Sequence, residues 1–107
     1  MFVRVVEISA KNGKGRELAQ TVNDKVIAVL KSHTGFVDEI TLVSEDNPDR
    51  MLALSFWKTS EDAERYNREG FNRVNEIIRN QIDGNPQVRT FDVATSTVHK
   101  IAAGKAA

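Results

Sequence analysis

Three aromatic and two polar side chains in this sequence are of types that form ligand pockets. Trp57 ends an apolar stretch, and Tyr66 and Phe71 follow on the apolar side of a predicted helix. Asn75 lies one helical turn beyond Phe71, and Glu7 lies in a predicted N-terminal strand. If the helix packs across a sheet, these five side chains line one cavity, and aromatic walls with a few polar groups suit a planar ligand. The alternative is ordinary core packing, with the Tyr66 hydroxyl at the rim.

Other kinds of site have little support in the sequence. The chain has no cysteine, which excludes disulfides, thiolate nucleophiles and thiolate metal sites. His33 and His99 lack the spacing of a metal-binding pair, so we predict no metal. Residues 11–15, KNGKG, lack the spacing of a phosphate-binding loop and are interpreted as a basic turn. With 15 basic and 15 acidic residues the net charge is zero, so we expect neither nucleic acid nor a membrane surface as a partner.

The length of 107 residues corresponds to one domain. The longest apolar run, residues 26–30, is far shorter than a membrane span. Residues 1–9 alternate like a strand and lack the apolar block of a signal peptide. Together with the absence of cysteine, these features predict a cytoplasmic protein.

Apolar periodicity predicts six elements in the order β-α-β-β-α-β. Alternating or apolar stretches predict strands at residues 2–9, 36–44, 51–57 and 88–98. Apolar residues at helical spacing predict helices at residues 16–32 and from about 59 to about 81. Thr59, with Asp62 three residues later, matches a helix N-terminus, and Gly70 predicts a break within the second helix. Residues 84–86 are interpreted as a turn.

The element order is that of a ferredoxin-like α+β domain, in which two helices cover one face of a four-stranded antiparallel sheet. We assign residues 1–98 to this domain and residues 99–107 to a C-terminal tail. Strand 51–57 is apolar on both faces, and the first and fourth strands also carry apolar residues on both faces. A sheet that is apolar on both faces needs a second cover, so we predict a homodimer that packs sheet to sheet.

Several of these features resemble the antibiotic biosynthesis monooxygenase (ABM) domain of the dimeric α/β-barrel superfamily. They are the element order, Gly35 and Phe36 at the start of the second strand, and FWKTSEDA at residues 56–63, followed by an aromatic residue and Phe71. The resemblance covers about residues 1–98. It implies a homodimer whose two sheets form a barrel, with a pocket between helices and sheet in each protomer. Some members oxidise aromatic substrates with O₂ and no cofactor, and others degrade haem.

The family resemblance gives a role to each candidate residue. In a cofactor-independent monooxygenase acting on a small aromatic or quinol, Glu7 would be the base, Tyr66 and Asn75 would form hydrogen bonds, and Trp57 and Phe71 would be walls. The haem-degrading branch has asparagine, tryptophan and histidine where this chain has Glu7, Tyr66 and Asn75. Haem degradation is therefore disfavoured, because no axial ligand is present. A non-catalytic dimeric domain that binds a small ligand is the alternative.

Overall fold

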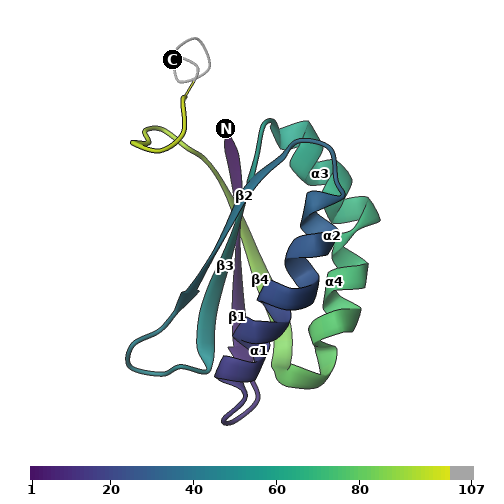
Figure 1. The fold of residues 1–107 in the computed structure, drawn as a ribbon, viewed down its shortest axis with the longest axis vertical. Helices are drawn as coiled ribbons and strands as arrows, with labels where there is room; N and C mark the ends of the chain where they lie inside the picture. Colours follow the sequence, from purple (N-terminus) through teal and green to yellow (C-terminus); the bar gives the residue numbers. More distant parts are fainter. Residues whose placement is uncertain (102–107) are drawn as a thin grey trace.

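The computed structural model describes residues 1–101 and confirms the ferredoxin-like α+β fold. Four antiparallel strands form one sheet in the order β2-β3-β1-β4, and the helices cover one of its faces (Figure 1). The strands are β1 (Phe2–Ala10), β2 (Phe36–Val43), β3 (Arg50–Trp57) and β4 (Ile82–Asp92). The helical segments are α1 (Gly15–Thr21), η1 (Val22–Val26), α2 (Ile27–Lys31), α3 (Ser60–Glu69), α4 (Phe71–Ile78) and η2 (Arg79–Gln81).

Strand alternation decides which side chains of β1 and β3 face the helices. Val6 and Ile8 of β1 pair with Ala53 and Met51 of β3, and these side chains pack into the core beneath the helices. Because successive residues point to opposite faces, the residues between them face away from the helices. The central strand β1 therefore contributes to two different surfaces, one on each face of the sheet.

The first helical segment is continuous from α1 through η1 to α2. Its buried side chains are those predicted from the apolar spacing: Leu18, Val22, Val26, Val29 and Leu30. The middle turn, η1, is π-helical. A π-helical turn adds a residue to the turn, which adjusts the phase of the apolar stripe. All five side chains thus remain on the face that covers the sheet.

The second helix is interrupted at Gly70, as the sequence predicted. The Thr59 hydroxyl accepts a hydrogen bond from the Asp62 backbone N–H at 3.1 Å and caps α3, which ends one residue before Gly70. A side chain at position 70 would collide with the rings of His33 and Tyr66. Glycine is therefore required by close packing at the point where α3 gives way to α4.

The fourth strand lies about six residues earlier than predicted. It spans Ile82–Asp92 instead of residues 88–98, and the expected turn at residues 84–86 is part of it. The pairing of β4 with β1 shifts register between Glu7 and Ser9, and Gly84 has a φ of +68° next to this irregularity. An edge strand with a bulge tolerates glycine and proline, which is why this segment resembles a turn in sequence. Residues 93–101 form no helix or strand, and residues 102–107 of the predicted tail lie outside the described part.

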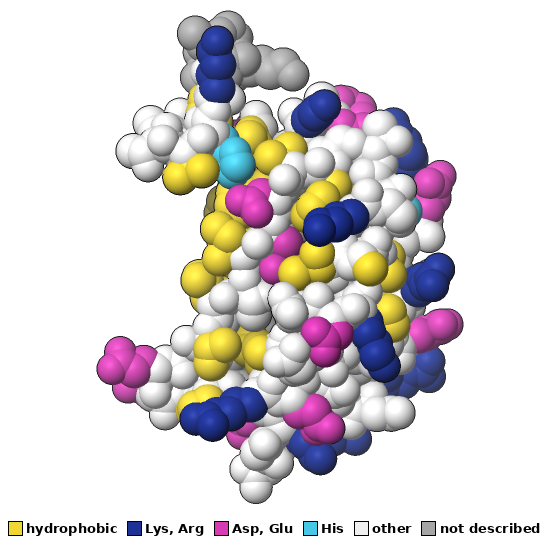
Figure 2. Space-filling model, in the orientation of Figure 1, with side chains coloured by type: hydrophobic (Ala, Val, Ile, Leu, Met, Phe, Trp, Pro, Cys, Tyr) yellow, Lys and Arg dark blue, Asp and Glu magenta, His cyan; other side chains and the backbone are white. Residues whose placement is uncertain are grey.

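The sheet face opposite the helices has no covering layer in the described chain (Figure 1). Ile40, Leu42 and Phe91 lie on it and are 43%, 46% and 52% exposed. Hydrophobic side chains follow this face along the left edge of the molecule in Figure 2. We call it the outer face. None of the helices within residues 1–101 is long and apolar enough to span a membrane.

Candidate functional site

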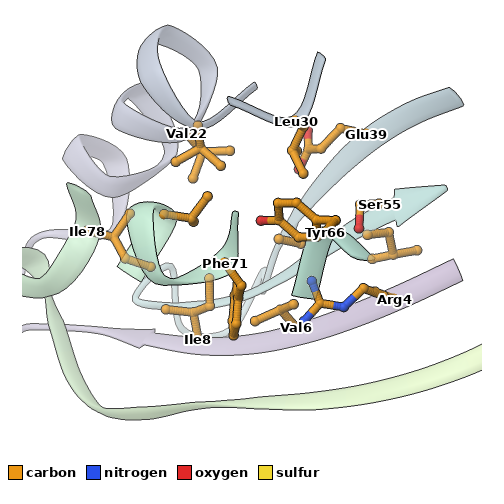
Figure 3. Close-up of a pocket in the computed structure, with 14 residues that line it drawn as sticks. Arg4, Val6, Ile8, Val22, Leu30, Glu39, Ser55, Tyr66, Phe71 and Ile78 are labelled. Carbon is orange, nitrogen blue, oxygen red and sulfur yellow. The ribbon is translucent and has the colours of Figure 1, made fainter. Parts of the chain in front are cut away.

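A cavity of about 40 Å³ lies between the helices and the sheet. Most of its wall is apolar and comes from β1, β3 and the helices, with Val6, Val22, Leu30 and Ile78 among the lining residues (Figure 3). The polar residues in the wall are Arg4, Glu39, Ser55 and Tyr66. The volume has room for a few water molecules but is far below the roughly 150 Å³ of an apolar cavity that binds benzene. An aromatic ligand would need this cavity to widen.

Arg4 is a buried cation in the wall of this cavity. Only 3% of its surface is exposed, and one guanidinium nitrogen, Nη2, donates a hydrogen bond to Asn67 Oδ1 at 2.9 Å. The guanidinium carbon lies 5.0 Å from the ring centre of Tyr66 and 4.6 Å from that of Phe71, within the range of cation–π attraction. Burial lowers the pKa of Arg4 below its ordinary value, yet an arginine remains charged at neutral pH.

Glu39 is a partly buried acid in the same cavity wall. Burial raises the pKa of Glu39, and a hydrogen bond from Thr41 Oγ1 to Glu39 Oε2 at 2.7 Å opposes that shift. Glu39 and Arg4 both pair with Ser55, from strands on either side of β3. The three residues therefore form one row across the sheet. Two strand spacings separate the Cα atoms of the acid and the cation, or about 10 Å.

Tyr66 covers this row from α3 and is 2% exposed. Its ring stacks on Trp57 with centroids 5.0 Å apart and meets the His33 ring edge-on at 5.2 Å. Burial raises the pKa of Tyr66 to about 12, although the nearby charge of Arg4 opposes the rise. The phenol is thus neutral near pH 7 and is able to donate a hydrogen bond.

Three of the candidate residues predicted from the sequence are at or next to this cavity. Tyr66 and Phe71 line it. Trp57 is fully buried behind Tyr66, where its Nε1 donates a hydrogen bond to Ser55 Oγ at 2.9 Å, and it supports the wall without lining it. Asn75 lines a separate hollow of about 520 Å³ between α4 and β4, and its Oδ1 is buried with no hydrogen-bond partner in the described chain.

The expected grouping of Glu7 with Tyr66 is wrong. Glu7 lies on the outer face, where its carboxylate pairs with Arg50 at 3.1 Å and with Arg89 at 3.3 Å. Strand alternation explains this position, because Glu7 is an odd-numbered residue of β1 and the even-numbered residues Arg4 and Val6 face the cavity. The structure thus separates Glu7 from Tyr66 by the thickness of the sheet.

Arg4 and Glu39 were not predicted as site residues from the sequence, although a signal for Arg4 was present. Arg4 shares a strand face with Phe2, Val6 and Ile8, so alternation places a charge among apolar side chains. A charged residue on a core-facing position is rare and often functional. Glu39 gave no comparable signal, because the β-bulge between Phe36 and Asp38 changes the alternation of β2.

The donor groups around the cavity do not fit a haem or a metal ion. No three His, Asp or Glu side chains within residues 1–101 are grouped as metal ligands. His33 packs against Tyr66 without lining the cavity, and His99 lies on the outer face beside Asp38 and Phe56. An imidazole ligand for a haem iron is therefore missing from the cavity wall.

Comparison with known proteins identifies the family to which this chain belongs. The sequence model of the family "Antibiotic biosynthesis monooxygenase" matches residues 1–81. The chain belongs to this family. No match was found among curated proteins.

Several solved structures share the fold of this chain at low sequence identity. SnoaB, a cofactor-independent oxygenase from Streptomyces nogalater, is 15% identical, with a TM-score of 0.74 over 92% of this chain and 97% of SnoaB. A protein of unknown function from Nitrosomonas europaea is 12% identical, with a TM-score of 0.74 over 96% of this chain and 95% of that protein. A conserved protein from Methanosarcina mazei is 19% identical, with a TM-score of 0.67 over 85% of this chain and 91% of that protein. At these identities the similarity concerns the fold.

Proposed function

We propose that this ABM protein is a cofactor-independent monooxygenase that acts on a small aromatic phenol or quinol. The observation that carries the proposal is the set of polar groups in one apolar cavity: a base, Glu39, a neutral phenol, Tyr66, and a cation, Arg4. Family membership supports it, as does the shared fold of SnoaB, which is described as a cofactor-independent oxygenase.

The proposed reaction needs no external reductant. A ring CH₂ group activated by a phenol or carbonyl is converted to a ketone: R₂CH₂ + O₂ → R₂C=O + H₂O. The substrate loses two hydrogens and four electrons, one oxygen atom enters the product, and the other leaves as water. Glu39 receives the first proton, and the raised pKa of this carboxyl brings it closer to that of a useful base. Tyr66 donates a hydrogen bond to the electron-rich oxygen of the substrate, and the apolar wall excludes water.

We further propose that the protein is a homodimer in which the outer faces of two sheets pack together. Three apolar side chains on this face, Ile40, Leu42 and Phe91, are each about half exposed. Exposed apolar side chains on a sheet face that no other layer covers are characteristic of an interface. A second copy of the chain offers an equally apolar surface of the same shape, as a two-fold symmetric contact requires.

A non-catalytic ligand-binding domain is the second candidate. The observation that favours it is the volume of about 40 Å³, since the closed cavity has no space for both an aromatic ring and O₂. In such a domain the same polar groups would select a ligand without turnover.

Oxygen uptake with a panel of quinols and anthrone-like compounds tests the catalytic proposal. We expect Glu39→Gln to abolish uptake and Tyr66→Phe to reduce it about 100- to 1,000-fold, as for the loss of one group that acts on a proton or on developing charge. Glu7→Gln is the matched control, because Glu7 is a β-strand glutamate on the opposite sheet face. No uptake by the wild type across the panel would favour the binding domain. Equal rates in Glu39→Gln and the wild type would refute the role of Glu39.

A further inference from the structure

Arg4 separates the inner cavity from a groove on the protein surface. The groove has a volume of about 270 Å³ and lies between α3 and β4, with Ala63, Asn67, Val88 and Thr90 among its lining residues. Among residues 1–101, Arg4 alone lines both this groove and the inner cavity. The guanidinium is therefore the shared wall between a closed apolar space and an open, partly polar one.

Arg4 forms no ion pair with another residue in the described part of the chain. Within residues 1–101, no carboxylate oxygen lies within 4.0 Å of its guanidinium nitrogens. Its hydrogen-bond partner, Asn67, is neutral and exposed. Burying a cation without an anion is costly, and it is retained in structures where the charge serves a purpose. Glu64 in the groove and Glu39 in the cavity are the nearby acids, and neither is paired with Arg4.

We propose that Arg4 is an anion-binding residue and that an aromatic monoanion, an ionised phenol or a carboxylate, reaches it through the α3–β4 groove. The anionic oxygen of the ligand replaces Asn67 Oδ1 as the acceptor of the Arg4 hydrogen bond. The aromatic ring of the ligand lies near Tyr66 and Phe71, the two rings that now flank the guanidinium. The aromatic nature of the ligand rests on the proposed function, whereas the anionic group rests on Arg4 itself.

This arrangement also explains how a ring enters a site of about 40 Å³. Arg4 donates a side-chain hydrogen bond to Asn67 and lies over the rings of Tyr66 and Phe71, so rotating it toward the groove breaks that hydrogen bond and weakens two cation–π contacts. The movement joins the inner cavity to the groove of about 270 Å³. The combined space is in the range of small-molecule binding sites.

Glu39 disfavours a negative charge at the end of the ligand that lies away from Arg4. It lies across Ser55 from Arg4, about 10 Å away between Cα atoms. A second anionic group at that end would face the Glu39 carboxylate, and like charges repel in a site of low dielectric constant. The site therefore selects a monoanion whose opposite end is neutral.

Isothermal titration calorimetry with three naphthalene probes tests this proposal on the full-length protein. The probes are 2-naphthoate, its neutral isostere 2-naphthamide, and the dianion 2,6-naphthalenedicarboxylate. We expect 2-naphthoate to bind at least 10-fold more tightly than the other two. Equal affinities for the anion and the amide would overturn the proposal, and so would the absence of binding by all three probes.

Two variants locate the anion. Arg4→Met is expected to remove the preference for 2-naphthoate over 2-naphthamide, and Arg4→Lys to retain part of it. Arg89→Met is the matched control, because it removes an arginine from the outer face and is expected to leave the preference unchanged. A preference that persists in Arg4→Met would overturn the assignment.

A third variant keeps the proposal testable if Arg4→Met does not fold. Asn67→Ala removes the competing acceptor from an exposed position and is expected to strengthen 2-naphthoate binding several-fold. Unchanged or weaker binding by this variant would refute the replacement of Asn67 by the ligand. Binding of 2-naphthoate by a protein that consumes no O₂ would support the anion site while refuting the oxygenase. Oxygen uptake that is unchanged in Arg4→Met would support the oxygenase while refuting the anion site at Arg4.

Discussion

Replacing Ile40 by a charged residue is expected to dissociate the proposed dimer. Ile40 lies on β2, is 43% exposed and pairs with Leu54 on the outer face. In a sheet-to-sheet dimer it would be buried in both protomers. We consider both Ile40→Asp and Ile40→Lys, because a single sign of charge has the chance of pairing with an opposite charge on the partner.

The size of the effect follows from the exposure of Ile40. Full burial of an isoleucine contributes ~1.5–3 kcal/mol, so covering the exposed part contributes about 0.7–1.3 kcal/mol per protomer. The variant dimer therefore loses about 1.5–2.5 kcal/mol of hydrophobic stabilisation, summed over the two protomers. Each new charge adds a desolvation cost of ~1–3 kcal/mol. The sum is about 4 kcal/mol or more, which corresponds to an increase of about 1,000-fold in the dissociation constant.

Size-exclusion chromatography with light scattering, over a concentration series, measures this change. The wild type is expected at twice the chain mass, and both Ile40 variants at the monomer mass at micromolar concentration. Val88→Asp is the matched control, since Val88 is 39% exposed but pairs with Val6 on the helix-facing side of the sheet. Dimeric Ile40 variants, or equal dissociation of the Val88 variant, would show that the outer face is not the interface.

Three further predictions concern the cavity. Tyr66 is the single tyrosine, so an ultraviolet absorbance titration is expected to show tyrosinate forming near a pKa of about 12, and a midpoint near 10 would indicate an exposed phenol. Glu39→Gln is expected to stabilise the protein at about pH 7.5 but not below pH 4.5, because ionisation of a carboxyl with a raised pKa lowers the stability of the folded state as pH rises. Urea unfolding at both pH values measures the free energy of unfolding. Equal stability of the wild type and the variant at pH 7.5 would contradict the prediction. Trp57→Phe removes the hydrogen bond to Ser55 Oγ and is expected to lower the free energy of unfolding, measured by urea denaturation, by ~1–3 kcal/mol. An unchanged free energy of unfolding would imply that a water molecule replaces the indole N–H as the donor to Ser55.

The fold was predictable where local pattern and tertiary structure agree. Alternation in residues 2–9 and helical spacing in residues 16–32 gave the correct elements, because a buried face imposes its period on the sequence. Gly70 was interpretable because glycine is costly inside a helix. The β4 segment was not, because its glycine, asparagine and proline at residues 84–86 are typical of turns. Only the pairing with β1 shows that an edge strand accommodates them.

The site was predictable only in part, and for a different reason. Tyr66 and Phe71 belong to the apolar stripe of the second helix, so their direction followed from their spacing. The candidate base Glu7 was grouped with Tyr66 because residue type was considered without strand parity: Glu7 and Arg4 are both charged, but their parity is opposite. Cavity volume, by contrast, depends on packing between distant residues and has no sequence signature.

The two proposed activities of the molecule, binding a ligand and pairing with a second copy, meet at β1. Its even-numbered residue Arg4 faces the cavity, and its odd-numbered residue Glu7 pairs with Arg50 and Arg89 on the outer face. The side chains of β1 that face the cavity and those that face outward point to opposite sides of the sheet. A substitution on one face therefore tests one proposal without removing a side chain from the other face. The backbone of β1 is common to both, and covering the outer face would hold it in place. Dimerisation would in this way fix the strand that carries Arg4, which is the kind of rigid support that a precise binding site requires.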